Sequence, residues 1–291
     1  MITKRPLVAI GFLLPALTAY GLFTLYPLVR GLWLSLTDSS GGPRSNFIGL
    51  ENYRRLIFDP DVHSATLITI QYAVIVVVLQ NLFGLLLARA LFERPHARRV
   101  IGTLVLLPTL VAPLMSSFIF SYLLAPDGAL NRMLALIGLP GLQHVWYGDP
   151  TTALASIAAV QIWMYTGYTA TIFLAGYLAI PRELLEAGRI DGATSWQQFR
   201  LIEWPLLAPS LTVCVTLSLI GSLRVFEFPF VLTNGGPAGS TMTLTLLIFN
   251  STFHAASKFA YGIAIAFALL VLVVVSAAIA TVVLRAREAR I

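Results

Sequence analysis

The chain has 291 residues, of which 57% are hydrophobic and only 11% are charged, and its net charge is +6. Soluble domains carry about 25% charged residues, so this composition excludes a soluble globular protein and indicates an integral membrane protein. The basic residues stand scattered at the ends of apolar runs, and we therefore expect no nucleic-acid partner. A helical span needs roughly 20 apolar residues, which leaves room for about six or seven spans and no large additional domain.

Six long apolar runs are predicted to cross the lipid bilayer as helices, within a single transmembrane domain over residues 1–291 of an all-α integral membrane protein. The runs cover residues 6–29, 64–90, 100–125, 151–179, 205–232 and 259–284. The first is too long for the apolar core of a signal peptide and no small-residue cleavage site follows it, so we expect it to be retained. Pro108 and Pro113 fall inside the third run and predict a kink, because proline removes a backbone donor.

The distribution of lysine and arginine predicts the orientation, because cytoplasmic loops are enriched in both residues. One set of flanks holds Lys4, Arg5, Arg89, Arg94, Arg98, Arg99, Arg182, Arg189, Arg200, Arg285, Arg287 and Arg290. The opposite set holds Arg30, Arg44, Arg54, Arg55, Arg132 and Lys258. The first set is twice as large, and an even number of spans puts both termini on one side. We therefore expect both termini in the cytoplasm.

Residues 30–63, 127–149 and 233–257 are then expected on the outer side of the membrane. Within the first, residues 47–53 predict a turn that leads into a short interfacial helix. The second has an apolar stripe with the spacing of a helix on a surface, at Leu130, Met133, Leu134 and Ile137. The third begins with Thr-Asn-Gly-Gly-Pro, which is typical of a turn.

Between the fourth and fifth runs lies a polar segment, residues 181–205. Pro181 favours the first turn of a new helix, which we predict over residues 181–189. Gly188 and Gly192 permit a sharp bend or a close approach of the backbone.

A second helix is predicted over residues 194–202, with Thr194 as its N-cap. Trp196, Phe199 and Ile202 follow one another at intervals of three, so they can share an apolar face. The segment is thus predicted as a helix–turn–helix that projects into the cytoplasm.

The amino-acid sequence of this segment resembles the cytoplasmic coupling loop of permease subunits in bacterial ABC importers. The family shows Glu-Ala-Ala, then Asp-Gly-Ala, then Ile-x-x-Pro. This chain has Glu186-Ala187-Gly188, Asp191-Gly192-Ala193 and Ile202-Glu203-Trp204-Pro205, with Gly188 in place of the second alanine and Trp204 in place of an aliphatic residue. In the family the loop docks into a groove of the ATP-binding subunit. The resemblance implies that Glu186 pairs with a basic residue there, and the alternative is an amphipathic loop that only anchors two spans.

Further markers extend the resemblance over nearly the whole chain. Trp163, Gly167-Tyr168, Leu174-Ala175-Gly176-Tyr177 and Ile180-Pro181 look like the fourth span of sugar-importer permeases, whereas Phe226, Leu232-Thr233 and Gly235-Gly236-Pro237-Ala238 look like the end of their fifth span and the turn after it. Residues 47–53 resemble their first outer loop. These markers resemble the maltose and glycerol-3-phosphate type of permease.

The resemblance implies the fold of a type I ABC importer permease in the bacterial inner membrane. It also implies a second permease subunit, two ATP-binding subunits that hold ATP and Mg²⁺, and an extracytoplasmic substrate-binding protein. The expected solute is a disaccharide or oligosaccharide. Glycerol-3-phosphate or a related phosphodiester is the alternative, and Arg224 would suit its anionic group. A secondary transporter is a further alternative, but the paired intramembrane acids or inverted repeats that it predicts are not clear in the sequence.

Arg224 and Glu227 are the foremost candidates for the solute pathway, because charges inside spans mark a pathway or a structural ion pair. They stand three residues apart and are predicted on one face of the fifth span. A sugar also needs aromatic surfaces and hydrogen-bonding groups. The further candidates are Phe226, Phe230, Gln161, Trp163, Tyr165, Tyr168 and Asn250. Helix packing or anchoring at the membrane interface is the alternative role for each of them.

The chain carries no Gly-x-x-x-x-Gly-Lys-Ser/Thr phosphate loop, so we expect ATP hydrolysis in a partner and no enzymatic activity in this chain. Its four histidines lack metal-ligand spacing, and we expect neither a metal nor another cofactor here. Cys214 is the single cysteine, which excludes an intrachain disulfide and indicates a packing residue.

Overall fold

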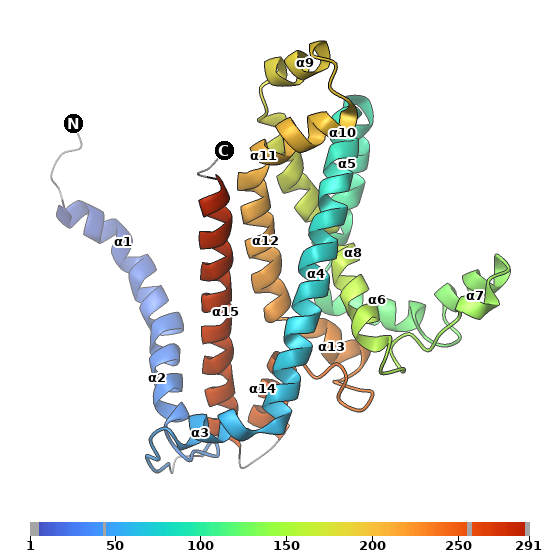
Figure 1. Cartoon of the computed structure of the whole chain (residues 1–291). Coiled ribbons are helices and arrows are strands. Elements are labelled where there is room, and N and C mark those ends of the chain that lie inside the picture. The colour runs from blue at the N-terminus through green and yellow to red at the C-terminus, as the bar shows by residue number, and fades with distance from the viewer. Residues whose placement is uncertain (1–5, 43–44, 255–257, 289–291) are drawn as a thin grey trace. The chain divides into compact units, whose positions relative to one another are not determined.

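The computed structural model describes residues 6–42, 45–254 and 258–288. Within these ranges the chain is built from helices, shown in chain order in Figure 1, and an isolated antiparallel bridge joins Thr37 to Phe47. Contacts between residues divide the chain into two compact units. The first comprises Met1–Val62 and Leu247–Leu269, and the second comprises His63–Leu246 and Leu270–Ile291.

The first unit begins with a long helical run. Its elements are α1 (Pro6–Tyr20), a π-helical turn (Gly21–Leu25), α2 (Tyr26–Ser35), α3 (Glu51–Phe58), a second π-helical turn (Asn250–His254) and the first part of α15 (Phe259–Glu288). Residues Phe12–Ser35 are long and apolar enough to cross a membrane. In their most apolar stretch of 18 residues, 0% of the residues are buried against the rest of the chain. Apolar side chains exposed on all sides of a helix require lipid or another protein around them. The helical run thus extends beyond the predicted span of residues 6–29.

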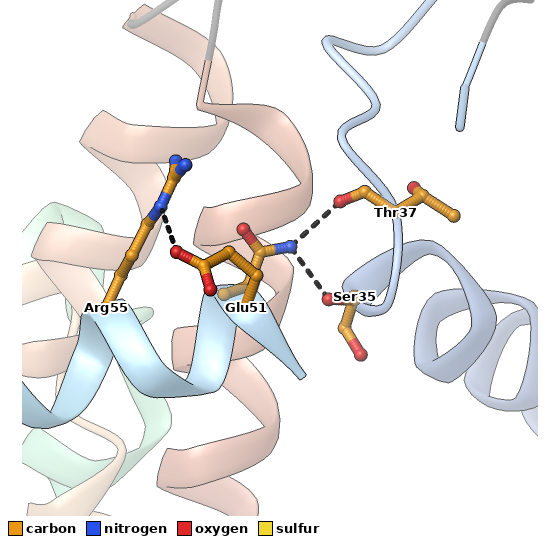
Figure 2. A network of polar contacts seen from close by, with 5 residues as sticks. Ser35, Thr37, Glu51 and Arg55 are labelled. Atoms are coloured by element: carbon orange, nitrogen blue, oxygen red, sulfur yellow. Dashed lines mark hydrogen bonds and ion pairs between the residues drawn. The ribbon is translucent and has the colours of Figure 1, made fainter. Parts of the chain in front are cut away.

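A buried polar network holds the beginning of α3 against the end of α2 (Figure 2). The side-chain amide of Asn52 donates to the carbonyl oxygens of Ser35 and Thr37, at 2.8 Å each. On the exposed side of α3, Glu51 and Arg55 form an ion pair at 3.5 Å, which contributes at most about 1 kcal/mol. The predicted turn and short helix after residue 47 are confirmed.

The loop that follows α2 is held by the carboxylate of Asp38. Asp38 accepts hydrogen bonds from the backbone N–H and the side-chain amide of Asn46, at 2.6 and 3.0 Å. These donors favour the charged form and hold the pKa of the Asp38 carboxyl below its usual range. The same contacts close the loop beside the bridge between Thr37 and Phe47.

The second unit contains most of the remaining helices. They are most of α4 (Pro60–Glu93), α5 (Pro95–Leu110), α6 (Pro113–Leu123), α7 (Ala129–Leu136), α8 (Ala153–Leu178), α9 (Arg182–Ile190), α10 (Ser195–Gln198), α11 (Trp204–Leu206), α12 (Ala208–Leu223), α13 (Glu227–Leu232), the first part of α14 (Leu244–Phe249) and the second part of α15. Helix α7 confirms the short helix that its apolar stripe predicted.

Among the described residues, four helices are long and apolar enough to cross a membrane: Phe12–Ser35, Pro60–Glu93, Ala153–Leu178 and Phe259–Glu288. Two bent pairs raise the number to as many as six if each pair is one span. These pairs are Arg98–Leu110 with Pro113–Leu123, and Ser195–Leu206 with Ala208–Leu223.

The predicted run 100–125 is two helices rather than one kinked helix, because α5 and α6 meet at a bend of 95°. Pro113 lies in the first turn of α6, and a residue that precedes proline is pushed out of the helical conformation. Ala112 and Val111 are accordingly both extended, with ψ angles of 137° and 139°. Two extended residues in succession turn the chain further than the loss of one hydrogen bond would.

The predicted run 205–232 is also interrupted, since α12 ends at Leu223 and α13 begins at Glu227. In a continuous helix, Pro229 would leave the carbonyl of Val225 without its usual donor. A break before the proline avoids this loss. Non-helical backbone at membrane depth is tolerated where it is buried in protein or lines a cavity.

Helix α8 packs against both α5 and α12 (Figure 1) and contributes to two clusters of buried side chains. The first cluster includes Tyr72, Val76, Ile157, Met164 and Phe228. The second includes Phe173, Tyr177, Leu185, Leu207 and Cys214. Because Leu185 belongs to α9, the second cluster attaches the polar segment to α8. Cys214 is 2% exposed and is a packing residue, as predicted.

Gly167 allows the close approach of α8 to α5, since an added Cβ would lie 1.9 Å from the carbonyl oxygen of Val105. Gly167→Ala must push the two backbones apart, and we expect it to destabilise the protein by about 1–3 kcal/mol or more. The measurement is the thermal unfolding midpoint of the purified protein in detergent. Gly102→Ala is the matched control on α5, where an added Cβ meets nothing within 4 Å. Equal midpoints for the two variants would contradict this packing.

Candidate functional site

A cavity of about 330 Å³ lies within the second unit, lined by parts of α4, α5, α8, α12 and α13. Its volume falls in the range of small-molecule sites, about 300–1,000 Å³. We call it the α8–α12 cavity, because these two helices supply most of its lining. Amides, tyrosines and two opposite charges stand out among the lining residues: Gln80, Gln161, Tyr165, Tyr168, Arg224 and Glu227.

Five of the predicted pathway residues meet in this cavity: Gln161, Tyr165, Tyr168, Arg224 and Glu227. The Gln161 side chain is buried, and its Oε1 accepts a hydrogen bond of 2.8 Å from the hydroxyl of Tyr72. This bond fixes the orientation of the amide at the cavity wall. Tyr168 is 43% exposed, so part of its ring remains accessible.

Gln80 of α4 also lines the cavity, although the sequence analysis did not single it out. Its Nε2 donates to the hydroxyl of Thr169 at 2.8 Å, whereas its buried Oε1 has no hydrogen-bond partner in the described part of the chain. An unpaired buried acceptor costs about 1–3 kcal/mol, so a donor that enters the cavity would relieve this cost. The adjacent amides Gln80 and Asn81, in an otherwise apolar run, were the available signal.

Arg224 and Glu227 do not lie on one face of a continuous helix, and this part of the prediction was wrong. Arg224 is the residue after the end of α12, and Glu227 is the first residue of α13. No ion pair joins the two side chains, although both residues fall within the described ranges. Both nevertheless line the cavity, because the break before Pro229 brings α13 to its wall.

Three further candidates lie in the second unit but outside the lining of the cavity. Phe226 and Phe230 stack on one another, with ring centroids 5.0 Å apart. Trp163 is 49% exposed and contacts the ring of Phe120 at 5.0 Å. Asn250 lies in a π-helical turn of the first unit. A role for these residues in a pathway stays a prediction.

The polar segment between α8 and α12 is a series of short helices, which we call the α9–α11 segment (residues 181–206; Figure 1). Gly192 has a φ of +78°, a left-handed conformation that favours glycine, and the chain turns there between α9 and α10. Thr194 then caps α10. Its hydroxyl accepts from the backbone N–H of Gln197 at 3.3 Å, and the Gln197 side chain accepts from the Thr194 N–H at 2.8 Å. The predicted N-cap is confirmed.

After four residues of α10 the helix widens into a π-helical turn (Phe199–Glu203), so the predicted helix 194–202 is not a uniform α-helix. Phe199 and Ile202 pack in the same cluster as Leu185 and Leu207, as their predicted apolar face required. Trp196 is 64% exposed. It contacts Phe199 at a centroid distance of 5.7 Å.

The motif residues of α9 and the following turn divide between a buried and an exposed face. Gly188 is buried beside Ile202. Glu186, Ala187, Asp191 and Gly192 are exposed, and Ala193 is half-buried. The Glu186 side chain makes no ion pair or hydrogen bond within the described residues, so its carboxylate is available to a partner.

Arg89, near the end of α4, attaches this segment to a second helix, and sequence reasoning missed this contact. Its guanidinium donates to the carbonyl oxygen of Ser195 at 3.1 Å and lies 3.5 Å from the carboxylate of Glu203. It also lies 4.9 Å from the ring centroid of Phe199. Glu203 is 5% exposed, and a buried carboxylate requires such a partner. The signal was an acid and a base at the ends of two apolar runs, which does not by itself identify a pair.

Comparison with known proteins places these features in a family. Residues 80–288 match the family described as "Binding-protein-dependent transport system inner membrane component". The chain is 34% identical over 273 residues to the trehalose/maltose transport system permease protein MalF of Thermococcus litoralis, covering 91% of this chain and 90% of the relative. It is 33% identical over 268 residues to the lactose transport system permease protein LacF of Rhizobium radiobacter, covering 91% and 89%.

A solved structure has the same fold. It is a chain of a bacterial ABC transporter involved in the import of the acidic polysaccharide alginate, with a TM-score of 0.84. The likeness covers 97% of this chain and 96% of that one, at 23% sequence identity. At this identity the likeness shows that the two chains share a fold.

Glycine is required at position 192 by its left-handed backbone conformation and not by lack of space, because an added Cβ would meet nothing within 4 Å. A side chain in the left-handed region costs roughly 1–2 kcal/mol, and asparagine tolerates that region better than a β-branched residue. We expect Gly192→Val to loosen the turn and Gly192→Asn to retain most of its order. The measurement is amide hydrogen exchange over residues 186–198 of the purified protein. Equal protection in both variants would contradict the constraint at this position.

Proposed function

Since the chain belongs to the family of binding-protein-dependent transport system inner membrane components, we propose that it is the membrane-spanning subunit of an ATP-driven sugar importer. It forms half of the translocation pathway for a disaccharide or oligosaccharide that an extracytoplasmic binding protein delivers. The relatives named for trehalose/maltose and lactose transport support a sugar as the solute.

The single observation that carries this proposal furthest is the lining of the α8–α12 cavity. A sugar presents apolar ring faces and many hydroxyls, and the cavity offers tyrosine rings beside amides in one place. The unpaired acceptor of Gln80 matches a sugar hydroxyl, which would donate a hydrogen bond to it. Arg224 can donate hydrogen bonds to further hydroxyls, and the carboxylate of Glu227 can accept hydrogen bonds from them.

An anionic solute such as glycerol-3-phosphate or a phosphodiester is less well matched. Arg224 would attract its phosphate, but the carboxylate of Glu227 lines the same cavity and would repel it. The two opposite charges cancel, which suits a neutral polyhydroxylated molecule. A secondary transporter is likewise disfavoured, since the matching family depends on a binding protein.

In the proposed architecture, α5 and α6 together form the third span and the fifth span covers residues 205–232, so that residues 1–291 form one permease domain with six spans. The excess of basic residues supports a cytoplasmic location for both termini and the α9–α11 segment, in a bacterial inner membrane. The partners are a second permease subunit, two ATP-binding subunits and the binding protein. ATP and Mg²⁺ belong to the ATP-binding subunits, and this chain has no catalytic role.

The α9–α11 segment is proposed to dock on an ATP-binding subunit. The segment exposes both the Glu186 carboxylate and apolar side chains, since Leu184 is 44% exposed and Ile190 is 86% exposed. Ala187, Gly188, Asp191, Gly192 and Ala193 complete the docking motif. Closure of the ATP-binding dimer would then move α9, and Leu185 would carry this motion into the cluster around Phe173 and Leu207. Alternating access of the cavity follows from that movement.

ATPase activity of the reconstituted complex tests the docking. Wild-type complex, with co-encoded partners and sugar-loaded binding protein, should hydrolyse ATP faster than without the binding protein. Glu186→Ala removes the exposed carboxylate and should lose this stimulation or the assembly with ATP-binding subunits. Glu183→Ala, on the exposed first turn of the same helix, is the matched control. Normal stimulation in Glu186→Ala would leave the segment as a membrane anchor only.

Tyr168 tests the cavity as the sugar site. Tyr168→Ala removes a ring worth about 0.5–1.5 kcal/mol in stacking, so we expect sugar uptake to fall by about two- to tenfold at saturating loaded binding protein. Tyr122→Ala is the control, because Tyr122 is 78% exposed on α6 and does not line the cavity. Uptake would be measured with radiolabelled disaccharide in proteoliposomes. A loss in both variants or in neither would contradict the assignment.

A further inference from the structure

Two arginines and two aromatic rings form a row at the C-terminal end of the α9–α11 segment. Arg89 of α4 lies 4.9 Å from the ring centroid of Phe199, and the rings of Phe199 and Trp204 are 6.0 Å apart. Arg287 of α15 lies 4.8 Å from the ring centroid of Trp204. We call these four residues the arginine–aromatic row. It joins the end of the α9–α11 segment to two helices that are distant from it in the chain, α4 and α15.

Each end of the row has a second polar contact. At the α4 end, Arg89 pairs with Glu203, the neighbour of Trp204. At the α15 end, Glu288 follows Arg287 and accepts a hydrogen bond from the hydroxyl of Thr212 on α12. The last turn of α15 is thus attached both to the segment and to the helix that follows it. Two independent contacts at one helix end indicate a built connection rather than a chance approach of one flexible arginine.

The row provides a connection to α15 that the buried cluster around α8 does not. That cluster contains side chains of α4, α8, α9 and α12, among them Leu85, Phe173, Leu185 and Leu207, but none of α15. A force on the segment can therefore reach α4 and α8 through packed apolar side chains. Its direct route to the last turn of α15 runs through Trp204 and Arg287.

The chemistry of the row suits a connection that persists while helices move. A guanidinium over an indole face is attracted by the ring quadrupole, and the attraction does not depend on one linear hydrogen bond. Small sliding of the ring beneath the cation therefore preserves the contact.

We propose that Trp204 and Arg287 are positioning residues that link the α9–α11 segment to α15, so that α15 moves together with the segment during transport. The inference rests on the proposed function, because it assigns a route for the motion that the ATP-binding subunits supply. Arg89 and Phe199 extend the same route to α4. None of the four residues lines the α8–α12 cavity, so the effect on transport is indirect.

The test measures ATP hydrolysed per sugar transported in proteoliposomes that contain the whole complex and sugar-loaded binding protein. Arg287→Ala, Trp204→Leu and the double variant are compared with wild type. We expect each single variant to use about fivefold more ATP per sugar, since residues along a coupling route change coupling by about two- to thirtyfold. Arg287→Ala, which lies outside the docking segment, should also assemble and keep its basal ATPase activity. Because both substitutions remove the same contact, the double variant should resemble either single one.

Matched variants separate this role from general destabilisation. Arg285→Ala removes an exposed arginine from the same last turn of α15 and should behave as wild type. Trp204→Phe keeps a ring face and should retain most of the coupling. If Trp204→Leu fails to assemble, Arg287→Ala and Trp204→Phe still decide the question.

The outcomes are distinguishable. If loaded binding protein stimulates hydrolysis in the wild type, but Arg287→Ala uses the same amount of ATP per sugar as the wild type, the proposed role of the arginine–aromatic row is contradicted. The proposed function is then unaffected. Strictly additive effects in the double variant also contradict the role of the row, because they show two unrelated contacts. A wild-type complex whose hydrolysis does not respond to loaded binding protein contradicts the proposed function, and the row as a transmission route with it.

Discussion

Backbone hydrogen bonding in hydrocarbon is the constraint on which the rest of this structure depends. A segment at membrane depth must satisfy its own N–H and C=O groups, so irregular backbone is restricted to places that protein or a cavity covers. The chain breaks its helices at Val111–Ala112 and again after Leu223. Thr109 lies just before the first break and Arg224 within the second, and both line the α8–α12 cavity. The breaks before Pro113 and Pro229 therefore lie beside residues of the cavity wall.

The α9–α11 segment depends on a different balance, between local and tertiary contacts. Gly192 and the capping box of Thr194 set the turn and the beginning of α10 with residues that are close in the chain. Four residues of α10 are too short to be stable alone, because helix nucleation is unfavourable. Leu185 in the buried cluster and Arg89 on the carbonyl of Ser195 hold the segment in place. The proposed docking on an ATP-binding subunit requires such an attachment, because a loosely held segment would bend without moving the spans.

Some of the charged residues attach separate helices to one another. Glu203 is buried and paired with Arg89, and Arg287 lies over an indole ring. Arg224 and Glu227 differ, because they share a cavity without pairing with one another. Charges within spans are costly and are candidates for functional sites, which is why these two residues belong to the proposed solute site.

The sequence by itself determined the helical class, the approximate position of the spans, the N-cap at Thr194 and the family resemblance. These features rest on composition, periodicity and residues that are near neighbours in the chain, whose physical effects are local. Only the tertiary structure decided that Gln80 lines the same cavity as Arg224 and Glu227. The same holds for the contacts of Arg89 with the ring of Phe199 and of Arg287 with the ring of Trp204. The tertiary structure also decided that Arg224 and Glu227 belong to different helices. Such pairings depend on how separate helices pack, and a single apolar run carries no information about which of its neighbours will face it.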